Sequence, residues 1–196
     1  MSASDYGCIP AAGAGIGRLA RLDLRDVEAA EALRIVKALT SADLAVWIDG
    51  GWGIDALLGR QTRDHDDIDL VVELDRFDDV LRIADELGYT LAENYLPTRA
   101  VLRSQSGSQI DFHPVAFDEN DVGWQRGAAP DGSDCEYPAD GFGLGKILDE
   151  PVPCLSPELQ ITHHLGYQAS EKDRRDMTVL AEAFDLPLPS PYSESL

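Results

Sequence analysis

Three aspartates in two short apolar segments are candidates for chemistry. Asp67 and Asp69 lie two residues apart in residues 67–73, where alternating polar and apolar side chains predict a strand. Side chains two apart on a strand share a face, so we expect both carboxylates to point the same way. Adjacent carboxylates repel each other unless a cation lies between them, and Mg²⁺ prefers carboxylate and phosphate oxygens. The pair therefore predicts a magnesium site.

Asp111 is the third carboxylate. It lies between apolar neighbours in a second predicted strand, residues 109–117. If this strand lies beside residues 67–73, three carboxylates converge on one face. Such a cluster can hold two divalent ions and a triphosphate, and a two-metal site stabilises the attacking and leaving oxygens of an in-line displacement. Asp111 is also a candidate general base that takes the proton of an attacking hydroxyl.

A glycine pair, Gly50 and Gly51, separates a short predicted strand at residues 45–48 from a short predicted helix at residues 52–58. Glycines there let backbone N–H groups approach phosphate oxygens, and the helix N-terminus adds the positive end of a dipole. We therefore expect this turn to bind nucleotide phosphates. Basic residues that are candidates to join it are Arg63, His65, Lys172, Arg174 and Arg175.

Each feature alone has a simpler explanation. An Asp-x-Asp pair on a surface strand is usually solvated, a Gly-Gly pair is usually a plain turn, and the charged run at residues 172–176 is typical of a solvated helix face. The neighbouring His163 and His164 do not face one way on a helix, which argues against a metal site there. Two glycine-rich strings, residues 13–17 and 141–147, lack the context of nucleotide-binding loops.

The predicted elements indicate an α+β fold in which helices flank a mixed β-sheet, with a small helical part at the C-terminal end. Ser156 followed by proline is a good start for the first C-terminal helix. Predicted helices cover residues 23–40, 52–58, 75–87, 157–169 and 171–185, and predicted strands cover 45–48, 67–73, 98–103 and 109–117, with shorter strand-like pieces at 122–125, 146–148 and 152–154.

The same pattern divides the chain into four parts. We expect a flexible tail over residues 1–22, an α+β domain over residues 23–155 and a helical part over residues 156–186. Prolines then favour an extended tail over residues 187–196.

Composition narrows the possible partners and locations. The 196 residues carry a formal net charge of −20, which argues against nucleic acid, is compatible with a cationic small substrate, and also simply favours solubility. Apolar runs are too short to cross a membrane, and no signal-peptide pattern is present. Cys8, Cys135 and Cys154 are typical of reduced thiols. We therefore expect a cytoplasmic protein, monomeric or homodimeric.

One segment carries a family resemblance. Residues 47–72, WIDGGWGIDALLGRQTRDHDDIDLVV, resemble the signature of antibiotic nucleotidyltransferases of the DNA-polymerase-β-like superfamily. The likeness is greatest to the lincosamide nucleotidyltransferases and next to the aminoglycoside 2″-adenylyltransferases. It continues through LPTR (96–99), IDFHPV (110–115), VPCLSPELQ (152–160) and HLGY (164–167), and so covers about residues 47–180.

The resemblance assigns roles to the residues already singled out. Gly50 and Gly51 match the phosphate-binding turn of the family, Asp67 and Asp69 match its metal-binding pair, and Asp111 matches its third carboxylate, a metal ligand or base.

Basic residues match further family elements. Lys172 begins a Lys-Asp-x-x-Asp element that ends at Asp176, and the lysine of this element can reach phosphate. Arg63 and His65 match an Arg-x-His motif that precedes the aspartates. Residues 118–145 match only loosely, and the acceptor pocket is expected there, so the resemblance fixes the nucleotide half of the reaction better than the acceptor half.

The resemblance implies a Mg²⁺-dependent nucleotidyltransferase that moves a nucleoside monophosphate, AMP from ATP, onto an antibiotic hydroxyl and releases pyrophosphate. A lincosamide is the expected acceptor, and an aminoglycoside is the alternative. Two further hypotheses remain open: a nucleotidyltransferase that modifies proteins, and a catalytically degenerate protein that only binds a ligand. Because Asp67, Asp69 and Asp111 are all present, the residues favour an enzyme.

Overall fold

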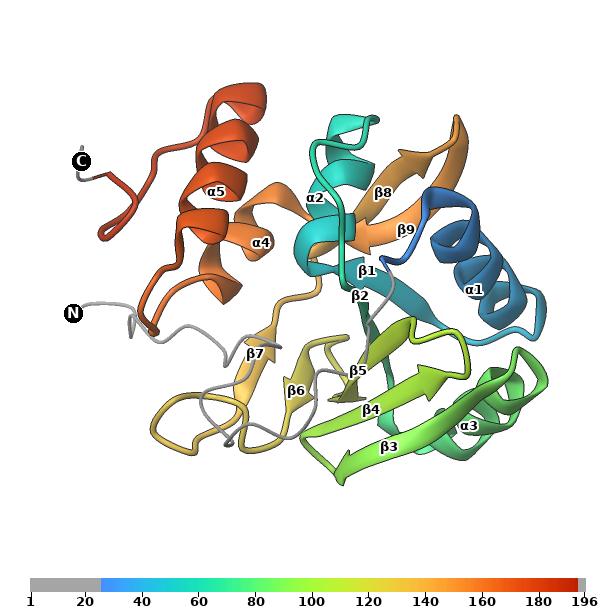
Figure 1. The fold of residues 1–196 in the computed structure, drawn as a ribbon. Coiled ribbons are helices and arrows are strands. Elements are labelled where there is room, and N and C mark those ends of the chain that lie inside the picture. Colours follow the sequence, from blue (N-terminus) through green and yellow to red (C-terminus); the bar gives the residue numbers. More distant parts are fainter. Residues whose placement is uncertain (1–25, 194–196) are drawn as a thin grey trace, which may run out of the picture.

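A mixed β-sheet forms the centre of the molecule in the computed structural model, which describes residues 26–193 (Figure 1). Its strand order is β3-β4-β5-β2-β1-β9-β8, and the short β6 and β7 continue from β5. The strands are β1 (Val46–Asp49), β2 (Asp67–Glu73), β3 (Tyr89–Tyr95), β4 (Arg99–Ser104), β5 (Gln109–Phe117), β6 (Gly123–Gln125), β7 (Cys135–Tyr137), β8 (Phe142–Ile147) and β9 (Glu150–Leu155). The expected α+β fold with a mixed sheet is confirmed.

The register of β2 and β5 is the feature of the sheet that matters most for the site. The two strands are parallel neighbours, and Asp69 lies directly opposite Asp111. Alternate residues Leu70 and Phe112 point into the main core, because side chains alternate between the two faces of a strand. The sheet therefore presents apolar side chains on one face and the aspartates on the other.

Two groups of helices lie on opposite sides of the molecule in Figure 1. The helices are α1 (Ala29–Ser41), α2 (Gly50–Leu58), α3 (Phe77–Glu86), α4 (Pro157–His163) and α5 (Glu171–Phe184), and a 3-10 turn (Leu74–Arg76) precedes α3. Helices α1 and α3 contribute to the main core beneath the sheet. Helices α4 and α5 pack on α2, where Ile54 of α2 shares a smaller core with Ile161 and Met177. Helix α2 therefore links the sheet to the C-terminal helices.

Some elements differ from the sequence-based expectation. The helix expected over residues 157–169 ends at His163, and α5 starts afresh with Ser170 and Asp173 forming a capping box. Strand β3 was not expected, because it is an exposed edge strand without a clear alternation of buried and exposed residues. The three residues of β7 are too few to show a period.

Other expectations concern the ends of the chain, the cysteines and the membrane. The tail expected over residues 1–22 lies outside the described residues, as does Cys8. Cys154 is a buried free thiol, whereas Cys135 is disulfide-bonded, so the expectation of a reduced thiol is wrong at Cys135. Among the helices of residues 26–193, none is long and apolar enough to cross a membrane.

Candidate active site

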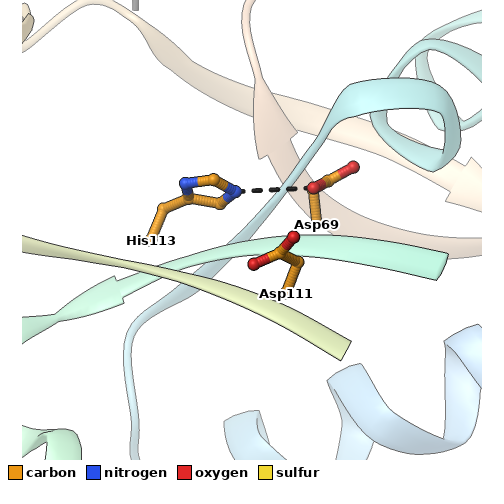
Figure 2. A group of neighbouring side chains, drawn as sticks. All are labelled: Asp69, Asp111 and His113. Carbon is orange, nitrogen blue, oxygen red and sulfur yellow. Dashed lines mark hydrogen bonds and ion pairs between the residues drawn. The ribbon is translucent and has the colours of Figure 1, made fainter. Parts of the chain in front are cut away.

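The parallel strands β2 and β5 bring the predicted carboxylates together. Figure 2 shows Asp69, Asp111 and His113 pointing toward one another, and each offers one potential ligand atom within 4.8 Å of the other two. Asp111 is fully buried, while Asp69 is partly exposed. Asp67 lies two residues before Asp69 and so shares its face. The side chains come from neighbouring strands, which fixes their spacing.

The electrostatics of this face favour a cation. Burial, followed by the charges of Asp69 and Asp111, raises the pKa of Asp67 to about 7. Burial likewise raises the pKa of Asp111, although a hydrogen bond from Arg99 acts in the opposite direction. Carboxylates that repel one another and resist ionisation form a donor set suited to a hard divalent ion such as Mg²⁺.

The glycine turn lies directly against these carboxylates. Helix α2 begins at Gly50, and the Asp49 side chain caps it by accepting a 2.7 Å hydrogen bond from the Gly50 backbone N–H. Gly50 has φ +59°, and a Cβ atom there would overlap Oδ2 of Asp69. Only glycine combines this backbone angle with this approach. The first backbone N–H groups of α2 therefore start next to the face that carries the aspartates.

Asp49 also has a histidine beside it. His163 Nδ1 lies 3.5 Å from Asp49 Oδ2. Burial alone would raise the pKa of Asp49, but His163, the charge of His113 and the Gly50 N–H together lower it to about 2. The carboxylate that caps α2 is thus held in its ionised form.

Arg63 and His65 lie behind the same turn. A Cβ atom on Gly51 would overlap both the Arg63 guanidinium and the His65 ring. Each side chain also has a carboxylate of its own. Arg63 donates from Nη2 to Asp176 Oδ2 at 2.7 Å, and His65 Nε2 lies 2.5 Å from Asp55 Oδ2. The structure therefore places both residues against the turn, with their charged or polar atoms paired to acids.

Lys172 lies at the rim of the site on α5. Its Nζ is 3.8 Å from Asp66 Oδ2, and its side chain is 45% exposed. Its charge lowers the pKa of Asp67, so Lys172 contributes positive charge to the acidic face. Asp176 lies one helical turn further along α5 and binds Arg63. Helix α5 therefore carries both Lys172 and the aspartate that holds Arg63 against the glycine turn.

Arg99 is a site residue to which the sequence analysis assigned no role. It extends from β4 and binds Asp111 with two hydrogen bonds, Nε to Oδ1 at 2.7 Å and Nη2 to Oδ2 at 2.5 Å. The sequence feature that could have indicated Arg99 is the hairpin of β4 and β5. Its register places Val101 opposite Asp111, and Arg99, two residues before Val101, therefore lies on the same face of the sheet as Asp111. Arg99 supplies positive charge inside the acidic cluster.

The sequence analysis also assigned no role to His113 or to its neighbours Gln125 and Tyr137. His113 Nε2 lies 3.4 Å from Asp69 Oδ1, and its Nδ1 lies 3.0 Å from Gln125 Nε2. Tyr137 donates its hydroxyl hydrogen to Gln125 Oε1 at 2.8 Å. Burial lowers the pKa of His113, but Asp69, Asp111 and Asp49 outweigh it and raise the pKa to about 9.

Comparison with known proteins identifies the family. The fold is that of a nucleotidyltransferase, and residues 31–180 match the family described as aminoglycoside-2″-adenylyltransferase. This chain therefore belongs to that family, and the resemblance recognised from the sequence is confirmed. A lincosamide resistance protein of Staphylococcus haemolyticus is 34% identical over 67% of this chain and 80% of its own length. A 2″-aminoglycoside nucleotidyltransferase of Escherichia coli is 34% identical over 68% of this chain and 71% of its own.

Solved structures agree with this assignment. The lincosamide antibiotic adenylyltransferase LnuA, crystallised with lincomycin, superposes with a TM-score of 0.71 and 29% identity over 80% of this chain and 98% of LnuA. The structure of ANT(2″)-Ia in complex with adenylyl-2″-tobramycin gives a TM-score of 0.64 and 25% identity, over 80% of this chain and 88% of that one.

Proposed function

We propose that this enzyme transfers AMP from ATP to a hydroxyl of a lincosamide antibiotic, with Mg²⁺, and releases pyrophosphate. The observation that carries the proposal is the convergence of Asp67, Asp69 and Asp111 on one face, against the glycine turn of α2. The lincosamide acceptor is supported by the likeness to LnuA along nearly the whole of that chain. An aminoglycoside acceptor is the second candidate, supported by the family description and by the Escherichia coli relative.

Asp67, Asp69 and Asp111 would hold Mg²⁺, which supplies charge neutralisation for the phosphates and the leaving group. The N–H groups of α2 from Gly51 onward would bind phosphate oxygens of the nucleotide. Gly50, whose own N–H donates to Asp49, allows the close approach of this turn to Asp69. Lys172 adds a positive charge at the rim.

Asp111 accepts the proton of the acceptor hydroxyl. The resulting oxygen attacks the α-phosphorus of ATP, a new P–O bond forms, and the bond to pyrophosphate breaks. Arg99 orients Asp111 with its two hydrogen bonds and favours the carboxylate form that a base needs. Burial keeps the Asp111 pKa above its usual value, which strengthens it as a proton acceptor.

Arg63 and His65 serve nucleotide binding through the turn they support. Both pack on the Gly51 backbone, and Asp176 and Asp55 hold them in place. The site therefore needs α5, although the carboxylates come from the sheet. We accordingly treat residues 23–155 as the nucleotidyltransferase domain and residues 156–186 as a helical part that completes its nucleotide site.

The net charge of −20 supports a small cationic partner over nucleic acid. We place the reaction in the cytoplasm, where ATP and Mg²⁺ are available, and expect a monomer or a homodimer.

One experiment separates the candidates. The protein is incubated with Mg²⁺, each of the four NTPs and a panel of lincosamides and aminoglycosides, and products are analysed by mass spectrometry. A lincosamide heavier by one AMP supports the proposal, whereas an aminoglycoside product supports the second candidate. Radioactive ATP that labels protein instead would indicate a protein-modifying enzyme. Drug binding without pyrophosphate release would indicate a degenerate family member.

The base role has its own test. We expect Asp111→Asn to bind ATP but to transfer AMP at least about 10²-fold more slowly, the lower range for loss of a general base. Asp78→Asn, an exposed aspartate on α3, is the matched control and should transfer normally. Transfer by Asp111→Asn at the wild-type rate would rule out the base role.

A further inference from the structure

His113 occupies a position that fits two different roles. Its Nε2 faces Asp69 and lies within the group of potential ligand atoms that includes Asp111. A histidine there either binds the metal directly, which requires a free lone pair on Nε2, or donates an Nε2–H hydrogen bond to the Asp69 carboxylate. The other ring nitrogen decides between them, because a neutral imidazole carries only one proton.

The other nitrogen, Nδ1, faces the Gln125 side-chain amide at 3.0 Å. The orientation of this amide follows from its other partners. Its nitrogen donates to the backbone carbonyl of Thr98 at 2.7 Å, and a carbonyl can only accept. Its oxygen accepts from the Tyr137 hydroxyl at 2.8 Å. Turning the amide over would place its oxygen against the Thr98 carbonyl oxygen in a buried site, which is costly.

The Gln125 nitrogen therefore presents its second hydrogen to His113 Nδ1. A proton on Nδ1 would then face another N–H group, so Nδ1 must accept, and the single proton of the neutral ring lies on Nε2. The same contact opposes the second proton that the surrounding carboxylates favour, because a proton on Nδ1 of the charged ring would also face the Gln125 N–H group.

We infer that Gln125, held by Thr98 and Tyr137, locks His113 as an Nε2–H donor that orients Asp69, so that His113 is a positioning residue and not a metal ligand. The inference rests on the proposed Mg²⁺-dependent transfer. The 3.4 Å separation of Nε2 and Asp69 Oδ1 is at the outer limit of a hydrogen bond, and such contacts in ligand-free sites commonly tighten in the complex.

The direct test measures the proton. Long-range proton–nitrogen NMR of ¹⁵N-labelled protein with Mg²⁺ and ATP distinguishes the two tautomers of a histidine, and His113→Gln identifies the His113 signals. We expect the Nε2–H form at His113. In parallel, pulsed EPR with Mn²⁺ in place of Mg²⁺ should show no directly coordinated imidazole nitrogen. A proton on Nδ1, or a coordinated nitrogen that disappears in His113→Gln, would overturn the inference.

Variants test the positioning role by metal affinity. His113→Leu removes the donor and should weaken Mn²⁺ binding by about 10–100-fold, the usual cost of losing a group that orients a metal ligand. His113→Gln can donate from a similar position and should stay within a few-fold of wild type. Gln125→Leu should leave His113 as a mixture of tautomers and weaken Mn²⁺ binding less than His113→Leu does. Unchanged affinity in His113→Leu would contradict the role.

The control is His164→Leu, which removes a partly buried histidine whose Nδ1 contacts the Gln160 carbonyl at 2.7 Å, outside the acidic face. It should bind Mn²⁺ normally.

Thermal unfolding of each variant reports folding, and if His113→Leu does not fold, the NMR result on the wild-type protein decides alone. A wild-type protein that binds no Mn²⁺ and transfers no AMP would refute the proposed function. Transfer together with a metal-coordinated His113 would refute only the present inference.

Discussion

Two aspartate–histidine pairs lie against the N-terminal turn of α2, Asp69 beside Gly50 and His65 beside Gly51, and they are built differently. Asp55 and His65 approach to 2.5 Å, and Thr62 donates both its N–H and its hydroxyl to Asp55 Oδ1. Asp69 and His113 are 3.4 Å apart, beside further carboxylates. The first pair has its hydrogen bonds satisfied within the protein. The second lies among further carboxylates whose oxygens a cation could share, and we propose that this difference separates a structural pair from a functional one.

The largest effect is expected from Asp69→Ala. Transfer should fall by about 10³-fold or more, because loss of a metal ligand removes several kcal/mol of transition-state stabilisation. Stability without Mg²⁺ should hold or rise, because a charge is removed from a repulsive cluster. Turnover with ATP and thermal unfolding without metal measure the two effects. A large loss of stability in Asp69→Ala would show that the Asp69–His113 pair, like the Asp55–His65 pair, mainly stabilises the fold.

Asp55→Ala should show the opposite behaviour. It leaves Thr62 and His65 without their acceptor, so the free energy of unfolding should fall by about 3 kcal/mol, as for other broken buried pairs. Activity per folded molecule should change by less than about tenfold, because weaker support of the glycine turn by His65 should raise the activation free energy by little more than about 1 kcal/mol. Urea unfolding and activity at low temperature test this. If activity disappears while the protein stays folded, Asp55 belongs to the functional group of residues.

Gly50→Ala should damage both stability and activity. The φ of +59° costs about 1–2 kcal/mol for a residue with a Cβ, and that atom overlaps Asp69. Gly59→Ala is a matched control, because Gly59 has φ +66° and nothing within 4 Å of its Cβ position. Both variants should lose stability, Gly50→Ala the more of the two because of the overlap, but only Gly50→Ala should lose transfer, by about 10²-fold, as for a misplacement of about 1 Å. Equal activity in the two variants would argue against the turn's role.

The stabilising effect of Mg²⁺ should depend on pH. Asp67 has a pKa of about 7 in the folded protein without metal, against 3.8 for a free carboxyl. The folded state therefore holds a proton that the unfolded chain has lost, and this contribution to stability decreases as pH rises from about 4 to 7. Mg²⁺ must displace that proton, so it should raise the unfolding temperature more above pH 7 than at about pH 5. Equal increases, at matched ionic strength, would contradict this.

Lys172→Gln should have the smallest effect. Its charge is exposed at the rim, so the KM for ATP should rise by less than about tenfold with kcat little changed, since an exposed charge contributes roughly 1 kcal/mol or less. Lys37→Gln is the control, because Lys37 on α1 pairs with Glu150 at 3.0 Å. Added salt should reduce the difference between wild type and Lys172→Gln. A loss as large as that of Asp69→Ala would place Lys172 at the reacting phosphate.

The sequence predicted the sheet face of the site well, because strand period alone orients Asp67 and Asp69 together, and apolar neighbours mark the buried side. The partners of these residues were harder to predict. Arg99 reaches Asp111 only through the register of a hairpin, and Gln125 and Tyr137 come from three-residue strands with no measurable period. The partner of His65, Asp55, lies in a helix of otherwise mainly apolar residues, where only the tertiary fold shows what it binds.

The ion pair of Arg63 with Asp176 joins residues 113 positions apart in the chain. During synthesis, β2 and β5 leave the ribosome well before α5 does, so the carboxylates have partners before the glycine turn has its full support. A nascent chain from which α5 has not yet emerged therefore contains the acidic face, while the glycine turn still lacks the support of Asp176. Newly made enzyme would thus gain its activity only after α5 has docked.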